Sequence, residues 1–234
     1  RCLLSNFMIE RDSNRGMCAH PCRWKYSLVE EKRPGEYYPI EEDDRGSYIM
    51  NSRDLCMIEH IPEIIESGIM SAKIEGRMKS VFYVAIVVNA YRKAIDNYFE
   101  DPLNYKFDEK LYYELIKASH REFTTGFYFN KPNNKDQNYQ TSSYIRDYSF
   151  VGIVKDYDCS TGYAIVEQRN KISVGEEIEI FGPGVDFFSQ ELTEMYNQDG
   201  IPINSAPHPQ QILKIKVNKP VAKNYMLRKQ KKEF

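Results

Sequence analysis

The chain has 234 residues, of which 41% are hydrophobic and 28% are charged. This is an ordinary globular composition, with room for one large or two modest domains. No apolar run approaches the roughly 18 residues that a membrane-spanning helix needs, which excludes a segment of that kind. The formal net charge of −2 neither favours nor excludes a nucleic-acid partner.

The cysteines are concentrated near the start of the chain. Four of the five lie within the first 56 residues, at Cys2, Cys18, Cys22 and Cys56. The fifth, Cys159, stands alone and receives no role. We see no signal peptide, so we expect a reducing, cytoplasmic setting in which clustered cysteines indicate metal or redox chemistry. The chain opens on Arg1 without a starting methionine, so we expect it to be part of a longer protein.

Residues 30–68 predict an exposed segment followed by a helix. Residues 30–47 are dense in charges and turn formers, which predicts a solvated loop or hairpin. A helical repeat of apolar residues follows, with Ser52 or Asp54 as the N-cap and Gly68 at the end. Pro62 falls inside this repeat, so we expect it to kink the helix or to split it in two.

The next residues predict one repeat of an α/β fold. Residues 69–74 are apolar enough for a short buried strand, closed by a turn at residues 75–77. Helices are predicted over residues 80–99 and 108–119, and the helix–strand–helix order indicates a parallel sheet. Apolar residues at helical spacing predict the buried face of the first helix, namely Val81, Val84, Ala85, Val88 and Tyr91.

The sequence pattern changes beyond residue 129. Residues 130–147 are polar and predict a linker. Short β-type runs separated by turns then predict a small β-barrel of about 85 residues. These runs cover residues 150–154, 162–167, 177–181 and 211–217. The basic end of the chain predicts either a soluble tail or a phosphate-binding strip. It contains Lys214, Lys216, Lys219, Lys223, Arg228, Lys229, Lys231 and Lys232.

The cysteine spacing indicates a metal site without selecting the metal. An iron–sulfur cluster needs thiolates that converge from loops, and tetrahedral zinc also takes four thiolates. Cys18 and Cys22 form one close pair, whereas zinc knuckles usually have two. Iron–sulfur, zinc and a set of buried structural cysteines therefore stay open as alternatives. His20, inside the pair, is a candidate for proton transfer or for loop packing. Trp24 is interpreted as a core residue rather than a base-stacking one.

Several sequence blocks resemble the peptidase U32 family, also called collagenase-like proteases. The first blocks surround the early cysteines, and the later ones contain Cys56, a charged turn and a histidine–arginine pair. They are Arg1–Asn6, positions within Arg11–Trp24, Asn51–Cys56, Lys73–Ser80 and Ser119–Phe127. Together these blocks extend over nearly the whole chain, which makes the resemblance specific.

The resemblance implies a fold of class α/β plus all-β. Residues 1–129 would be the C-terminal part of a TIM-barrel-like catalytic domain, residues 130–147 the linker and residues 148–234 a small β-barrel domain. In barrel enzymes the ends of the strands carry the active site. Lys73, Glu75 and Arg77, at the end of the expected strand, are therefore candidate catalytic residues that orient a substrate or bind a phosphate. The alternative is a structural ion-pair turn.

The resemblance also implies oxygen-independent hydroxylation of RNA. Members with this layout convert the wobble uridine of tRNA to 5-hydroxyuridine by prephenate-derived chemistry, so tRNA is the implied partner and prephenate the implied co-substrate. Related members hold a 4Fe-4S cluster on four cysteines, and Cys2, Cys18 and Cys56 match three of them. The fourth ligand would lie upstream of Arg1, or Cys22 would take that place.

Two other function classes stay open. The chain has no HExxH and no GxSxG motif, yet a protease dyad of Cys18 or Cys22 with a histidine needs only proximity in space. The β-barrel with its basic tail is alternatively a non-catalytic RNA-binding module. We favour hydroxylation, because nothing in the sequence points positively to a protease. With most of the catalytic domain outside the chain, we expect the fragment alone to be inactive.

Overall fold

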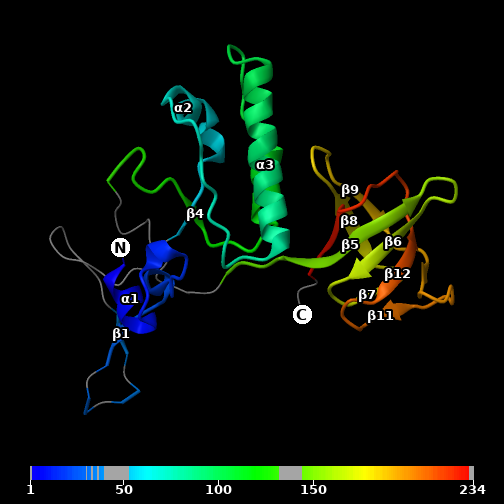
Figure 1. Ribbon diagram of the computed structural model, residues 1–234, viewed down its shortest axis with the longest axis horizontal. Coiled ribbons are helices and arrows are strands. Elements are labelled where there is room, and N and C mark those ends of the chain that lie inside the picture. Colours follow the sequence, from blue (N-terminus) through cyan, green and yellow to red (C-terminus); the bar gives the residue numbers. More distant parts are fainter. Residues whose placement is uncertain are drawn as a thin grey trace. The chain divides into compact units, whose positions relative to one another are not determined.

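The computed structural model describes residues 2–29, 31–32, 34–35, 37–39, 53–131 and 144–231. The chain divides into two compact units. The first combines Arg1–Cys56 with His120–Tyr144, and the second combines Met57–Ser119 with Ile145–Phe234. Each unit therefore uses two separate stretches of the chain, which can be followed by colour in Figure 1. No helix in the described ranges is both long and apolar enough to span a membrane.

The first unit consists of short elements joined by loops. They are α1 (Leu3–Ile9), η1 (Ser13–Arg15), η2 (Pro21–Arg23), β1 (Ser27–Leu28), β2 (Tyr38–Pro39), β3 (Asp54–Leu55) and β4 (Phe123–Thr124). β1 and β2 pair antiparallel, whereas β3 and β4 pair in parallel. The buried positions of this unit, as far as it is described, are polar side chains and one proline: Ser5, Pro21, Asp54, His120 and Arg121.

The second unit begins with helices. They are η3 (Ile58–His60), α2 (Ile61–Glu66), α3 (Val81–Glu100) and α4 (Glu109–Ile116). Ser80 caps α3 by accepting the Tyr83 N–H at 3.2 Å, and Asp108 caps α4 by accepting the Lys110 N–H at 3.0 Å. The helices predicted over residues 80–99 and 108–119 are thus confirmed.

The helix predicted from Ser52 or Asp54 to Gly68 is wrong in its first half. Asp54 lies in β3, and helical backbone begins only at η3 and continues in α2. Pro62 falls in the first turn of α2, where its missing N–H costs no hydrogen bond, so it does not kink the helix. Ser52, most of the predicted loop at residues 30–47 and most of the predicted linker at residues 130–147 lie outside the described residues.

The strand predicted at residues 69–74 is also wrong. This segment has irregular backbone, and Ile69, Met70 and Ile74 expose 54%, 101% and 38% of their surface. A strand of a parallel sheet is normally covered on both faces, and these side chains are not covered. The described residues therefore do not form the expected helix–strand–helix repeat, and their parallel pairing occurs at β3 and β4 instead.

The buried face of α3 differs from the predicted one. Val81, Val84 and Val88 are exposed by 59%, 39% and 46%. The buried residues lie mainly on another side of the helix and are Phe82, Ile86, Val87, Ala90, Ala94 and Tyr98. Ala85 and Tyr91 of the predicted face are half-buried. Both sets have helical spacing, but the buried one holds two large aromatic rings, whose burial removes more apolar surface from water.

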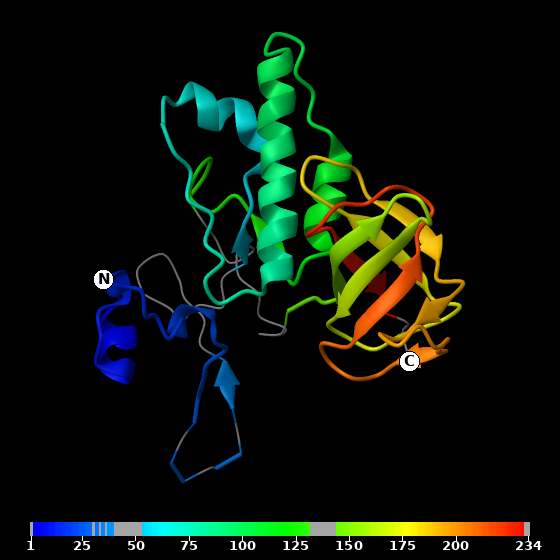
Figure 2. The ribbon, with the colours of Figure 1, turned by 45° about the vertical axis from the view of Figure 1, so that its right-hand side comes forward.

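The rest of the second unit is a curled antiparallel sheet (Figure 2). Its strands are β5 (Tyr148–Asp158), β6 (Tyr163–Gln168), β8 (Glu177–Phe181), β9 (Phe188–Glu191), β10 (Met195–Tyr196), β12 (Ile212–Lys216) and β13 (Met226–Gln230). The seven strands have the order β10-β12-β6-β5-β13-β8-β9, and β7 (Ile172–Ser173) pairs separately with β11 (Ser205–Ala206). The four predicted β-type runs are thus confirmed. The described strand order ends at β10 and β9, so the sheet is a half-barrel rather than a closed β-barrel.

The sheet has an apolar core of its own, and a separate apolar cluster lies between the sheet and the helices. The sheet core includes Val151, Val154, Ala164, Val166, Ile178, Ile180, Leu192, Leu213, Ile215 and Leu227. A second cluster joins α3 and α4 to the sheet through Phe82, Ile86, Ala118 and Phe181, and the rings of Phe82 and Phe150 stack with centroids 5.1 Å apart. Helices and sheet are therefore held together by continuous apolar contact.

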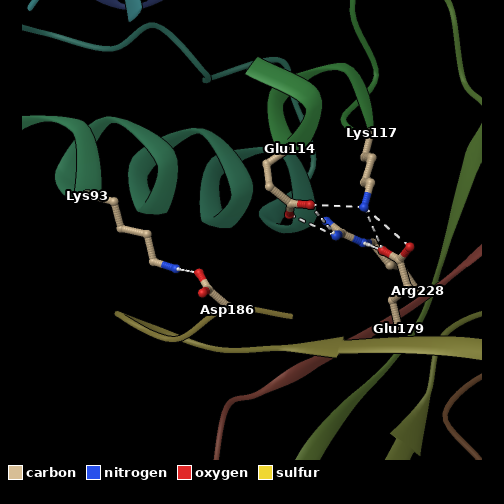
Figure 3. Close-up of polar contacts among 6 residues, drawn as sticks. All are labelled: Lys93, Glu114, Lys117, Glu179, Asp186 and Arg228. Atoms are coloured by element: carbon tan, nitrogen blue, oxygen red, sulfur yellow. Dashed lines mark hydrogen bonds and ion pairs between the residues drawn. The ribbon is translucent and has the colours of Figure 1, made fainter. Parts of the chain in front are cut away.

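A buried group of charges lies beside this contact (Figure 3). Arg228 on β13 is 0% exposed; its Nε donates to Glu179 at 2.6 Å and its Nη2 donates to Glu114 at 2.7 Å. Lys117 lies 3.0 Å from Glu179 and 2.9 Å from Glu114. The basic strip predicted at the end of the chain is wrong for Arg228, which is a structural residue of a sheet strand. Lys229 on the same strand pairs with Glu176 at 2.7 Å, and Lys232 lies outside the described residues.

Candidate functional site

Cys2, Cys18, Cys22 and His20 lie in the first unit, where hydrogen bonds join the segments that carry them. The sulfur of Cys2 accepts the Ser5 N–H at 3.4 Å, and the sulfur of Cys18 accepts the His20 N–H at 3.4 Å. The Ser5 hydroxyl in turn accepts the Ala19 N–H at 2.9 Å, which ties α1 to the segment after Cys18. Backbone N–H groups directed at sulfur are among the contacts that tune iron–sulfur clusters.

Cys22 on η2 lies within electrostatic reach of the other two thiols. Burial raises the pKa of Cys22, the charge of Arg23 lowers it, and the charges of Cys18 and Cys2 raise it further. A raised pKa keeps this group a neutral thiol at neutral pH, so it becomes a ligand only when a metal displaces its proton.

The donor set is compatible with an iron–sulfur cluster in its chemistry. All five cysteines are free thiols, and Cys2, Cys18 and Cys56 are half-buried. Among the described residues, however, no three His, Cys, Asp or Glu side chains are arranged around a common point as a metal requires. The fold therefore places Cys2, Cys18, Cys22 and Cys56 in one unit, but the described residues are not arranged as the ligands of a metal.

A buried ionic network connects the Cys22 segment to the strand that precedes Cys56. Asp54 on β3 accepts the Arg23 guanidinium at 3.1 Å and the Arg121 backbone N–H at 3.0 Å. The Arg121 guanidinium donates to the Arg23 carbonyl oxygen. Because Arg23 follows Cys22 directly and Asp54 lies two positions before Cys56, this network limits how far the two thiols can move apart.

The parallel pair β3 and β4 positions Cys56 at the end of a strand. Asp54 is opposite Phe123 and Leu55 is opposite Thr124 in the register. The Cys56 N–H donates to the Thr124 carbonyl oxygen at 2.9 Å and extends this pairing. Cys56 and the residues after Thr124 therefore leave the same edge of the strand pair, where catalytic groups of parallel sheets usually lie.

The structure corrects or refines two further predictions for the first unit. His20 adopts a left-handed backbone with φ of 54° and precedes the buried Pro21 at the start of η2. Such a conformation is uncommon outside glycine and fixes the direction of the chain between Cys18 and Cys22. Trp24 is 41% exposed, so its prediction as a core residue is wrong. Its ring centroid lies 6.1 Å from that of Tyr26.

Lys73, Glu75 and Arg77 belong to the second unit and lie in the irregular segment before α3. Lys73 is 3.8 Å from Glu75, and Glu75 accepts the Arg77 N–H at 2.9 Å. The side chain of Lys73 is 86% exposed and that of Glu75 is 51% exposed. The expected strand end is absent here, and the three residues form an exposed ion-pair turn. Their catalytic role stays a prediction.

Residue-by-residue reasoning missed the ionic network. Arg23, Asp54 and Arg121 are each part of a sequence block that resembles the U32 family, but none was predicted to be part of the site, and Asp54 was predicted only as a helix N-cap. The signal available was a charged residue within two positions of each of two cysteines, Arg23 after Cys22 and Asp54 before Cys56. The pairing itself spans 31 residues between Arg23 and Asp54 and 98 residues between Arg23 and Arg121, so spacing does not reveal it.

Comparison with protein families matches both parts of the chain. The profile of peptidase family U32 matches residues 1–138, and that of the peptidase family U32 C-terminal domain matches residues 146–228. The solved structure of the C-terminal domain of a putative U32 peptidase from Geobacillus thermoleovorans is 42% identical. It covers 35% of this chain and 99% of its own, with a TM-score of 0.34.

Curated relatives carry two kinds of name. The tRNA hydroxylation protein P1 of Bacillus subtilis (strain 168) is 41% identical over 99% of this chain, and the tRNA hydroxylation protein P of Escherichia coli (strain K12) is 33% identical over 87%. A collagenase of Porphyromonas gingivalis (strain ATCC BAA-308 / W83) is 30% identical over 83% of this chain. The chain covers 54%, 53% and 46% of these three proteins, so it spans about half of their length.

Proposed function

Because this chain belongs to peptidase family U32, we propose that it is part of an enzyme that hydroxylates tRNA. The observation that carries the proposal is the 41% identity, over 99% of the chain, to a tRNA hydroxylation protein. That similarity extends over both the cysteine-bearing unit and the curled sheet. A relative named a tRNA hydroxylation protein in a second organism, 33% identical over 87% of the chain, supports the same assignment.

The proposed reaction converts the wobble uridine to 5-hydroxyuridine without molecular oxygen. Replacing C5–H by C5–OH is a two-electron oxidation, so the oxygen donor must also take up two electrons and be reduced; we assign both roles to a prephenate-derived co-substrate. A 4Fe-4S cluster supplies electron transfer when it is bound. We propose Cys2, Cys18 and Cys56 as three of its ligands, with Cys22 or a thiol outside this chain as the fourth. With tRNA as the substrate, the reaction takes place in the cytoplasm.

The polar residues around the thiols would then have separate tasks. Asp54, Arg23 and Arg121 hold the loop of Cys22 and the strand before Cys56 in a fixed relation. His20 lies between two thiols and is the group we propose for moving a proton at the reacting base. Lys73, Glu75 and Arg77 are exposed, which suits contact with a phosphate of the tRNA backbone.

The test is the nucleoside content of tRNA. We would delete the full-length gene and every paralogue in one bacterium and restore either the wild-type gene or the Cys18→Ser variant. Mass spectrometry should show 5-hydroxyuridine and its derivatives with the wild type and not with the variant, because the serine hydroxyl is a poor iron ligand. The matched control is Cys159→Ser, an exposed thiol in the second unit, which should restore the nucleoside fully. Normal levels in the deleted strain would contradict the proposal.

Proteolysis is the second candidate, because two relatives are named collagenases. A cysteine protease needs a thiolate nucleophile and a basic partner, but no metal. Cleavage of gelatin by the purified full-length protein that persists after iron removal and disappears in Cys18→Ser would favour this alternative. We expect no cleavage under either condition.

A further inference from the structure

Three consecutive aromatic side chains after β4, Phe127, Tyr128 and Phe129, are exposed, and the first two are the most exposed. Phe127 is 84% exposed and Tyr128 is 65% exposed, and they are consecutive in the chain. A large ring that stays exposed does not contribute the free energy that its burial would provide. Neighbouring exposed rings therefore often mark an interaction site. These rings are part neither of the cysteine set (Cys2, Cys18, Cys22 and Cys56) nor of the ionic network.

The turn that carries these rings is well defined. The Thr124 hydroxyl accepts the Gly126 N–H at 3.1 Å, and the Thr125 carbonyl accepts the Tyr128 N–H at 3.3 Å. Gly126 has a φ of 58°, and a Cβ added there would lie 3.3 Å from Leu55 Cδ1. Glycine therefore allows both the left-handed backbone and the close approach to β3. The rings project from a fixed turn, so presenting them to a ligand costs little ordering.

The same turn lies next to Cys56. The Cys56 N–H donates to the carbonyl oxygen of Thr124, and Phe127 follows three residues later. A further exposed ring, that of Trp24, lies two positions after Cys22. One exposed pair of rings therefore lies on the segment that pairs with the Cys56 strand, and Trp24 lies close in sequence to Cys22.

Exposed positive charge accompanies both aromatic positions. Lys25 follows Trp24 directly, and Lys131 lies three positions after Tyr128; both are exposed. Flat rings interspersed with cations are typical of surfaces that bind single-stranded nucleic acid, because the bases stack on the rings while the cations neutralise phosphates. Protein interfaces are also rich in aromatic rings but are depleted in lysine, so it is the adjacent lysines that favour a nucleic acid here.

We propose that Phe127, Tyr128 and Trp24 form a stacking platform that holds an unpaired base of the tRNA anticodon loop beside the cysteine set. The proposal rests on the proposed function and adds the residues that bind its substrate. Sequence-specific proteins commonly read RNA loops by stacking splayed-out bases on aromatic rings, so a wobble uridine is a suitable occupant.

The direct test is photo-cross-linking of the full-length protein to an anticodon stem–loop with 5-iodouridine at the wobble position. Halogenated uridine cross-links to an aromatic ring stacked on it, so we expect the adduct on the peptide that contains Phe127 and Tyr128, or on Trp24. An adduct confined to other peptides would overturn the proposal. This measurement uses the wild-type protein and does not depend on a variant folding.

The supporting test is the affinity of a Phe127→Leu/Tyr128→Leu double variant for the same RNA. Leucine keeps apolar surface but removes stacking, so Kd should rise by about 10-fold or more. Phe99→Leu is the matched control, because Phe99 is 62% exposed on α3 in the second unit and should leave Kd unchanged. An unchanged Kd in the double variant overturns the platform and favours a protein segment as the occupant of the turn.

The two proposals fail in different ways. A wild-type protein that restores 5-hydroxyuridine in cells, together with a double variant that restores it equally, overturns the platform and leaves tRNA hydroxylation standing. A wild-type protein that neither binds nor modifies tRNA overturns the proposed function. Iron content and thermal unfolding of the double variant should equal those of the wild type, because the replaced rings are exposed.

Discussion

The two units of the molecule are stabilised by different means. The second unit buries a continuous apolar core in its sheet and a further apolar cluster between sheet and helices. In the described part of the first unit, the buried side chains are polar or proline, while Leu3 and Phe7 are exposed by 80% and 83%. Small units without an apolar core usually depend on disulfides or a metal. Because its cysteines are free thiols, the first unit is the one that a bound cluster would stabilise.

The largest expected effect is in the second unit, at Arg228. Arg228→Met leaves the carboxylates of Glu114 and Glu179 without their main buried partner, which should lower the free energy of unfolding by about 3–5 kcal/mol. Urea denaturation followed by circular dichroism measures this loss. Lys93→Met is the control, because its partner Asp186 is 97% exposed and such a pair contributes at most about 1 kcal/mol. Equal losses in the two variants would show that the buried charges are no more important than exposed ones.

The next effect concerns the polar network of the first unit. Asp54→Ala removes the acceptor for the Arg23 guanidinium and the Arg121 N–H, which should cost about 1–3 kcal/mol of local stability. Hydrogen exchange should rise at residues 21–24 and 120–124, and iron bound per chain should fall. Glu122→Ala is the comparison variant, because its pair with Arg53 is half-exposed and its loss should change neither quantity. Unaltered exchange in Asp54→Ala would mean that the network does not hold these loops.

The smallest effect is a pH dependence at the turn between β5 and β6. Hydrogen bonds from the Ser160 and Thr161 side chains lower the pKa of Asp158 from 3.8 to about 2. Because the folded pKa lies below the unfolded one, the contribution to stability is present above about pH 4 and is lost as pH falls through about 2. Carboxyl chemical shifts followed by NMR should show this midpoint. A midpoint near the ordinary value of aspartate would mean that these hydrogen bonds do not form in solution.

Local patterns predicted most of the second unit. The capping residues Ser80 and Asp108 marked the start of α3 and α4, and alternation marked four strands of the sheet. β13 was missed because Arg228 and Lys229 made it resemble a basic tail. Their partners Glu114 and Glu179 lie 114 and 49 residues away in the sequence, so nothing local signals that an arginine is buried there.

The first unit was predicted by residue type rather than by pattern. Cysteine content alone predicted a metal or redox role for it, and that role stays a prediction. Its two-residue strands are too short to show any alternation, so β3 was taken for the start of a helix. The polar contacts that join Arg23, Asp54 and Arg121 depend on parallel pairing between distant segments, which sequence spacing does not encode.

The most direct test of the proposed cluster is hydrogen exchange of the full-length protein before and after treatment with an iron chelator. We would compare anaerobically purified protein, after iron and sulfide have been quantified, with the same protein treated with a chelator. In the chelator-treated protein we expect protection to be lost in residues 2–29, 53–56 and 120–131, and to be retained in the sheet and in α3 and α4. Equal protection of the first unit in both samples, or protein purified with zinc and without iron, would contradict it.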